Sequence, residues 1–97
     1  MGVIMFEYDD NEFIEAAHRE LLHELNEELN KVKRSKIEYY KLKAKRKLYK
    51  TCYLKYSINL YNELCNQVDA ELNGINLDEL NNKISDIEDQ IEILENV

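Results

Sequence analysis

Apolar residues recur along this chain at the three- and four-residue spacing of α-helices, in three successive patterns. In the first, over residues 14–32, the apolar positions are Ile14, Ala17, Leu21, Leu22, Leu25, Leu29 and Val32. The third is a regular heptad made by Leu77, Leu80, Ile84, Ile87, Ile91 and Leu94. Acidic residues fill the opposite faces of both, so each predicts an amphipathic helix with an acidic outer surface.

The second pattern, over residues 36–73, is apolar on two sides of the predicted helix. One stripe contains Ile37, Tyr40, Ala44 and Leu48, and the other contains Leu42, Tyr49, Tyr53, Tyr56 and Leu60. Towards its end the pattern continues through Leu64, Cys65, Val68 and Leu72. Because a helix that is apolar on two sides normally lies between two neighbours, we expect this helix to contact both of the others.

The residue types that end and begin helices are clearest near Gly74. Asn73-Gly74 suits a helix C-terminus, and Asn76 with Glu79 three residues later suits the start of the next helix. This predicts a tight turn at residues 73–76 and an antiparallel hairpin in which the last helix returns along residues 54–73. At the other end of the chain, Asp9 and Glu12 have the spacing of a capping box that begins the first helix.

A second boundary is expected near Ser35. Ser35 and Glu38 have the spacing of a capping box, which favours a new helix. Against a boundary, residues 33–36 contain no Gly, Pro or Asn, and a heptad series runs from His18 to Leu60 without interruption. We expect a break or hinge here, since one unbroken helix leaves a long apolar stripe uncovered unless the protein dimerises.

These patterns predict an all-α fold in a single domain, residues 1–97. It is an antiparallel helical hairpin or an elongated two- or three-helix, coiled-coil-like bundle. Its helices cover about residues 10–33, 36–73 and 76–96, with one continuous helix over the first two as the alternative. Residues 1–8 form a short apolar segment before the first helix.

Composition agrees with long helices and adds a distinctive charge layout. The 97 residues include no proline and two glycines, so the chain has few residues that favour turns. The net charge of −7 divides into −8 over residues 1–30, +10 over residues 31–55 and −9 over residues 56–97. The basic segment, residues 31–55, holds eleven of the thirteen Lys and Arg residues and four of the seven tyrosines.

Several function classes are disfavoured by the sequence. The start of the chain lacks a signal-peptide core, and no apolar run approaches the ~20 residues of a membrane span, so we expect a cytoplasmic protein without membrane contact. Cys52 and Cys65, placed on one helix, lie too far apart for a disulfide. The string HELNE at His23 lacks the second histidine of a zinc motif, and no Gly-rich phosphate loop exists. We therefore predict no enzyme activity, no cofactor and no metal site.

The basic segment allows two interpretations. In one, its lysines neutralise acidic helices of the same chain or of a dimer partner, and its tyrosines belong to the core. In the other, it binds nucleic acid, with phosphates contacted by the residues of one helical arc and tyrosines stacking on bases. The residues of that arc are Lys36, Lys43, Arg46, Lys47 and Lys50.

The acidic helix faces indicate a protein partner. Such a face can occupy a cleft that normally holds nucleic acid, and the candidate residues are Glu20, Glu24, Glu27, Glu28, Asp86, Glu88, Asp89 and Glu92. In composition the chain resembles phage-encoded helical inhibitors, anti-CRISPR proteins among them, a resemblance that assigns no site residues. The first functional hypothesis is therefore a non-enzymatic, protein-binding module that inhibits a nucleic-acid-handling complex. The alternatives are a nucleic-acid-binding accessory protein that uses residues 31–55 and a structural coiled-coil assembly protein; a homodimer is expected.

Overall fold

The structure is a computed structural model that describes residues 10–97, and these residues form three α-helices and no strand. The helices are α1 (Asp10–Tyr56), α2 (Asn59–Asn73) and α3 (Leu77–Glu95). The 47 residues of α1 make a helix about 70 Å long at ~1.5 Å per residue. The predicted all-α, elongated class is confirmed. The expected cap at Asp9 and the segment 1–8 lie outside the described residues.

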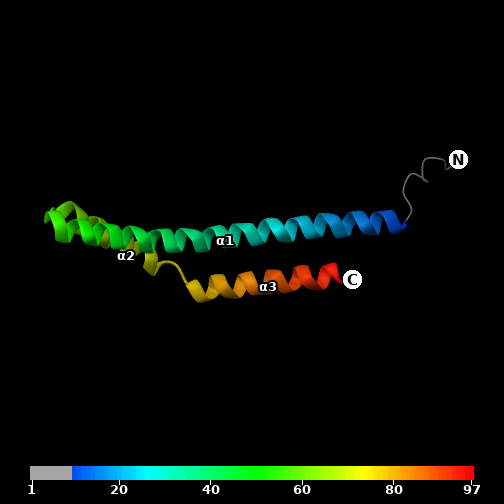
Figure 1. Cartoon of the computed structure of the whole chain (residues 1–97). Helices are drawn as coiled ribbons and strands as arrows, with labels where there is room; N and C mark the ends of the chain where they lie inside the picture. Colours follow the sequence, from blue (N-terminus) through cyan, green and yellow to red (C-terminus); the bar gives the residue numbers. More distant parts are fainter. Residues whose placement is uncertain (1–9) are drawn as a thin grey trace.

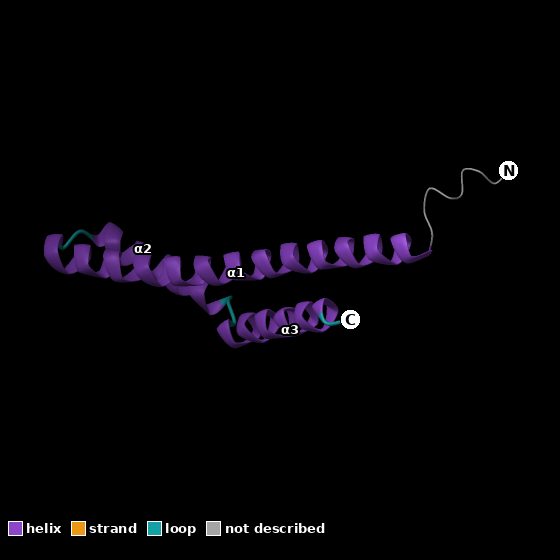
Figure 2. Cartoon of the chain, turned by 45° about the vertical axis from the view of Figure 1, so that its right-hand side comes forward, coloured by secondary structure: helices purple, strands orange, loops and turns teal. Residues whose placement is uncertain are grey.

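Both shorter helices pack along α1, and neither packs on the other. Figure 1 shows α2 returning along the C-terminal half of α1, after which α3 continues in the same direction along the N-terminal half. The described chain is therefore a rod two helices thick. One side is the unbroken α1, and the other side is α2 followed by α3, with a short loop between them (Figure 2).

The predicted break near Ser35 is wrong, because local side chains support the helix at this point. The Ser35 hydroxyl donates a hydrogen bond to the Lys31 carbonyl at 3.3 Å, so it does not cap a new helix. Glu38, the expected partner in a capping box, is instead paired with Arg34 one turn earlier, with 3.5 Å between Oε1 and Nη2. With both groups engaged inside the helix, α1 continues to Tyr56.

The chain reverses at residues 57–58, inside the segment predicted to be one helix over 36–73. Ser57 has a φ of 52°, in the left-handed region, and its N–H donates to the Tyr53 carbonyl at 2.8 Å. This is the geometry of a helix C-terminus, although the residue there is usually glycine. Ile58 is extended and starts α2 without a side-chain cap.

The prediction of a hairpin at residues 73–76 is also wrong, although its capping residue is right. Gly74 has φ −83° and ψ −3°, a right-handed conformation that does not reverse the chain. Asn76 caps α3 as predicted, and its side chain accepts a hydrogen bond from the Glu79 N–H at 3.1 Å. The loop therefore connects α2 to α3 without reversing the direction of the chain.

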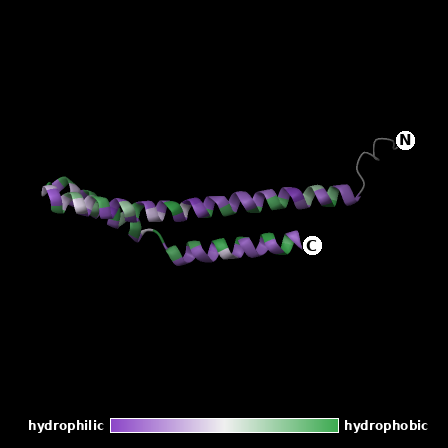
Figure 3. Ribbon diagram, viewed as in Figure 1, coloured by the Kyte–Doolittle hydropathy of each residue, from purple (hydrophilic) through white to green (hydrophobic). Residues whose placement is uncertain are grey.

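The core is thin and follows the predicted apolar faces. The buried residues among those described are Leu29, Val32, Cys65, Val68 and Ile87. Ile87 packs with Leu29 and Val32 on α1, and the other heptad positions of α3 are half-buried around them. Figure 3 shows hydrophobic residues recurring between hydrophilic ones along all three helices. Among the described residues, the stripe of Ile37, Tyr40, Ala44 and Leu48 stays uncovered, because α1 has only one neighbouring helix at each point; Ile37 is 56 % exposed and Leu48 is 57 % exposed.

Candidate functional site

The fold separates charge along the rod instead of neutralising it. The basic end, residues 31–73, joins the basic segment of α1 to α2 and has a net charge of +7. The acidic end consists of residues 10–30 of α1 and residues 77–95 of α3, and its net charge is −12. The most basic segment thus packs on a helix with few acids, whereas two acidic segments pack on each other.

The predicted acidic residues on α1 and α3 flank the same stretch of the rod. All eight are exposed, and α3 is positioned by the contact of Ile87 with Leu29 and Val32. One local ion pair lies among them, between His23 and Glu27 at 3.0 Å, and both side chains are mostly exposed. Like charges are tolerated here because burial of each apolar residue contributes about 1.5–3 kcal/mol, whereas water and salt screen repulsion between exposed carboxylates.

Four of the five predicted basic residues line one shallow surface pocket. It has a volume of about 400 Å³ and is lined by Lys43, Arg46, Lys47, Lys50, Thr51 and Leu72. Leu72 lies near the end of α2, so the pocket lies between α1 and α2. Lys36 precedes Lys43 by two helical turns on the same side of α1. The structure therefore brings Lys43, Arg46, Lys47 and Lys50 together, and their role in binding stays a prediction.

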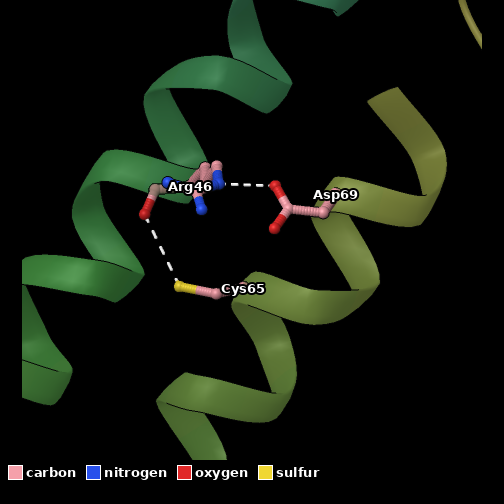
Figure 4. Close-up of polar contacts among 3 residues, drawn as sticks. All are labelled: Arg46, Cys65 and Asp69. Atoms are coloured by element: carbon pink, nitrogen blue, oxygen red, sulfur yellow. Dashed lines mark hydrogen bonds and ion pairs between the residues drawn. The ribbon is translucent and has the colours of Figure 1, made fainter. Parts of the chain in front are cut away.

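Arg46 differs from the other cations of this cluster, because it holds α2 against α1. Its Nε donates a hydrogen bond to Asp69 Oδ1, and the Cys65 thiol donates to its backbone carbonyl at 3.7 Å (Figure 4). The hydrogen bond and charge of Asp69 raise the pKa of Arg46, which remains charged at every physiological pH. Arg46–Asp69 is the one ion pair of the described chain that connects the basic segment to another helix. Among the described residues, neutralisation of the basic segment by another helix is thus confined to this pair, since Arg34–Glu38 lies within α1.

The tyrosines divide between the helix contact and the surface. Tyr49 stacks on Tyr61 across α1 and α2, with ring centroids 6.5 Å apart, and Tyr53 is half-buried beside them. Tyr40 and Tyr56 are exposed, and the Tyr39 ring lies 5.2 Å from the Lys43 ammonium. Tyr49, Tyr53 and Tyr61 are half-buried at the contact of α1 with α2, so the interpretation of the tyrosines as core holds only in part, and it is wrong for Tyr40 and Tyr56.

An apolar surface at the 57–58 turn was missed by the sequence reasoning. Its members are Leu54, Tyr56, Ile58 and Leu60, and all are exposed; we call these four residues the apolar tip. The missed signal is the tripeptide Ser57-Ile58-Asn59, three weak helix formers in succession within the predicted helix 36–73.

Cys52 and Cys65 are free thiols on different helices. The prediction that both cysteines lie on one helix is therefore wrong. Within residues 10–97, no three His, Cys, Asp or Glu side chains are grouped to hold a metal ion. None of the helices in that range has the length and apolar character needed to cross a membrane.

Comparison with known proteins gave no match: no family model, no curated protein and no solved structure resembles this chain.

Proposed function

We propose that this chain is a small, non-enzymatic, protein-binding helical module whose acidic end binds a positively charged surface that otherwise holds nucleic acid. The supporting observation is the division of charge, with exposed carboxylates of α1 and α3 along the same stretch of a rod. Carboxylates repeated along a rigid rod present a series of negative charges, as the phosphates of a nucleic acid do. An inhibitor of a nucleic-acid-handling complex, of the kind that phages encode, fits this surface.

The test compares two variants with equal changes of charge. Glu24→Lys with Glu88→Lys reverses charge at the acidic end, and Glu63→Lys with Glu71→Lys makes the same change on α2. A protein retained from a source-cell lysate by the tagged wild type is purified, and its affinity for each form is measured. We expect the acidic-end variant to bind at least about tenfold more weakly, and the α2 variant to bind as the wild type does.

Competition with nucleic acid makes the test specific. If the acidic end occupies a nucleic-acid-binding surface, added DNA or RNA displaces the chain from its partner. Undiminished binding in saturating nucleic acid, or equal loss in both variants, contradicts the proposal.

A second candidate function, direct binding of nucleic acid by the basic end, is supported by the pocket that Lys43, Lys47 and Lys50 share. Its assay is a fluorescence-anisotropy titration with labelled single- and double-stranded DNA and RNA at several salt concentrations. Each phosphate contact contributes about −0.9 to the slope of log K against log salt for duplex DNA. Changing the three lysines to Glu is expected to abolish binding, and changing them to Gln to reduce the slope by about 2–3 units.

The control for this assay changes Arg34, Lys41 and Lys45, which lie on the opposite side of α1, to Glu. Arg46 is left unchanged in all variants, because its replacement also breaks the contact with Asp69 on α2. This candidate is eliminated if the wild type does not bind nucleic acid or if its affinity does not depend on salt. It is also eliminated if the control variant loses as much affinity as the variant of Lys43, Lys47 and Lys50.

A further inference from the structure

The basic end of the rod terminates in the apolar tip, which nothing in the described chain covers. Its four side chains are between 49 % and 70 % exposed, at the turn where α1 reverses into α2. Figure 1 shows this turn at the end of the rod far from α3. Lys55 lies beside it, with its ammonium 5.4 Å from the centroid of the Tyr56 ring. The tip is therefore apolar at its centre and cationic at its edge.

At the opposite end, no side chain of residues 10–97 covers an apolar groove. The C-terminal part of α3 lies beside Leu21 and Leu25, where a pocket of about 250 Å³ is lined by Leu21, Leu25, Gln90, Ile93, Leu94 and Val97. Because this pocket places the end of α3 beside Leu21, the first turns of α1 extend past the end of α3 (Figure 1). Ile14 and Ala17 continue the face that α3 covers farther along the helix, and both are exposed.

The two ends are complementary in charge as well as in apolar character. Asp10, Glu15 and Glu20 lie on the part of α1 that precedes Leu21, and Glu95 is the last residue of α3. Lys50 and Lys55 lie near the tip. A second copy whose tip lies along residues 10–21 occupies the side of α1 that α3 covers farther along the helix.

We propose that this protein self-associates head to tail, with the apolar tip of one copy bound in the groove at the acidic end of the next. The interface joins two different surfaces, so it is heterologous, and it extends into open chains unless the rotation between successive copies closes a ring. Only a few side chains take part on each side, which corresponds to a weak interface that forms at high protein concentration. This inference goes beyond the proposed partner protein and does not depend on it.

The exposed stripe on the middle of α1 is a poorer site for a second copy. Ile37 and Tyr40 lie in a surface hollow together with Lys33 and Lys36. Pairing this stripe with itself places the basic segments of two copies against each other, and close like charges oppose association. The stripe therefore supplies a matched control.

The experiment measures molar mass against concentration by sedimentation equilibrium. Three variants carry paired changes to glutamine, which favours helix and adds no charge. They are the tip variant (Leu54→Gln, Leu60→Gln), the groove variant (Ile14→Gln, Ile93→Gln) and the stripe control (Ile37→Gln, Leu48→Gln). All six side chains are exposed, so circular dichroism is expected to show unchanged folding. We expect the wild type and the stripe control to form concentration-dependent oligomers that weaken with salt, and the tip and groove variants to remain monomeric.

Mixing the tip and groove variants decides the geometry. Each retains one intact surface, so an equimolar mixture is expected to form dimers and nothing larger, with an affinity at least about tenfold above that of either variant alone. A symmetric dimer cannot give this result. The proposal is overturned if the wild type is monomeric, if the stripe control alone loses association, or if the mixture stays monomeric. If the wild type is monomeric but binds phosphatidylglycerol vesicles, and the tip variant does not bind them, the tip contacts a lipid surface and the proposal is overturned.

Discussion

Replacing Ser57 with glycine is expected to stabilise the protein, because Ser57 holds the left-handed conformation that reverses the chain. Its φ is 52°, and a non-glycine residue in this region costs roughly 1–2 kcal/mol. Glycine removes that cost but adds about 0.5–1 kcal/mol of conformational entropy to the unfolded chain. The difference predicts a gain of about 0.5–1 kcal/mol, which raises the midpoint of thermal unfolding by roughly 2–8 °C for a domain of this size.

Gly74→Ala is the companion variant, and it too is expected to stabilise. Gly74 has a right-handed conformation, and an added Cβ meets the Glu71 carbonyl at 3.5 Å, an ordinary contact. Alanine reduces the conformational entropy of the unfolded chain, which raises the free energy of unfolding by about 0.4–1 kcal/mol. Both variants are expected to destabilise the protein if the chain instead turns at Gly74 and continues as helix through Ser57. In that case Gly74→Ala introduces backbone strain, and Ser57→Gly lowers the free energy of unfolding by roughly 0.5 kcal/mol.

Urea unfolding followed by circular dichroism measures both variants. The expected result is a higher midpoint with an unchanged slope for each, since neither change alters the surface exposed on unfolding. A lower midpoint for Ser57→Gly refutes the assignment of the turn to residues 57–58.

Three further predictions concern the core, the cap of α3 and the acidic end. Ile87→Ala is expected to lower the free energy of unfolding by about 2 kcal/mol, whereas the same change at Ile93, which is 67 % exposed, stays within about 0.5 kcal/mol of the wild type. Asn76→Ala removes the hydrogen bond to the Glu79 N–H and is expected to cost about 1 kcal/mol in urea unfolding, with Asn81→Ala as a control that costs nothing. Sodium chloride is expected to raise the thermal midpoint by screening repulsion at the acidic end; a steady fall contradicts the packing of α3 on the acidic half of α1.

The helices themselves were predictable from the sequence, because their apolar periodicity matches what packing requires. The heptad of α3, the face of α2 from Leu64 to Leu72 and the cap at Asn76 are all as predicted. The position of the reversal was not predictable from turn residues, since the left-handed residue is a serine and the glycine is right-handed. The heptad of α3 suits packing against either residues 54–73 or the N-terminal half of α1. With the turn placed at residues 73–76, the sequence therefore predicted the wrong one of these two partners.

The candidate surfaces were only partly visible in the sequence. The cluster of Lys43, Lys47 and Lys50 follows directly from helical spacing, and the pocket is consistent with it. Separation of the two charged ends depends on which helices are neighbours, so it follows only from the topology. The apolar tip depends on the unforeseen turn: Leu60, predicted as part of an apolar stripe, lies at the end of the rod and remains 56 % exposed.

One pair of distances tests the arrangement on which both proposals depend. Nitroxide labels are placed at Glu20→Cys and Glu95→Cys, and in a second sample at Lys50→Cys and Glu95→Cys, after Cys52→Ser and Cys65→Ala. With α3 beside the N-terminal half of α1, the first pair of backbones lies roughly 10–12 Å apart, one helix diameter. The second pair is separated by about 44 Å along α1, at ~1.5 Å per residue from the neighbourhood of Leu21. A short distance between residues 50 and 95, with a long one between 20 and 95, contradicts the account and places α3 back along the basic end.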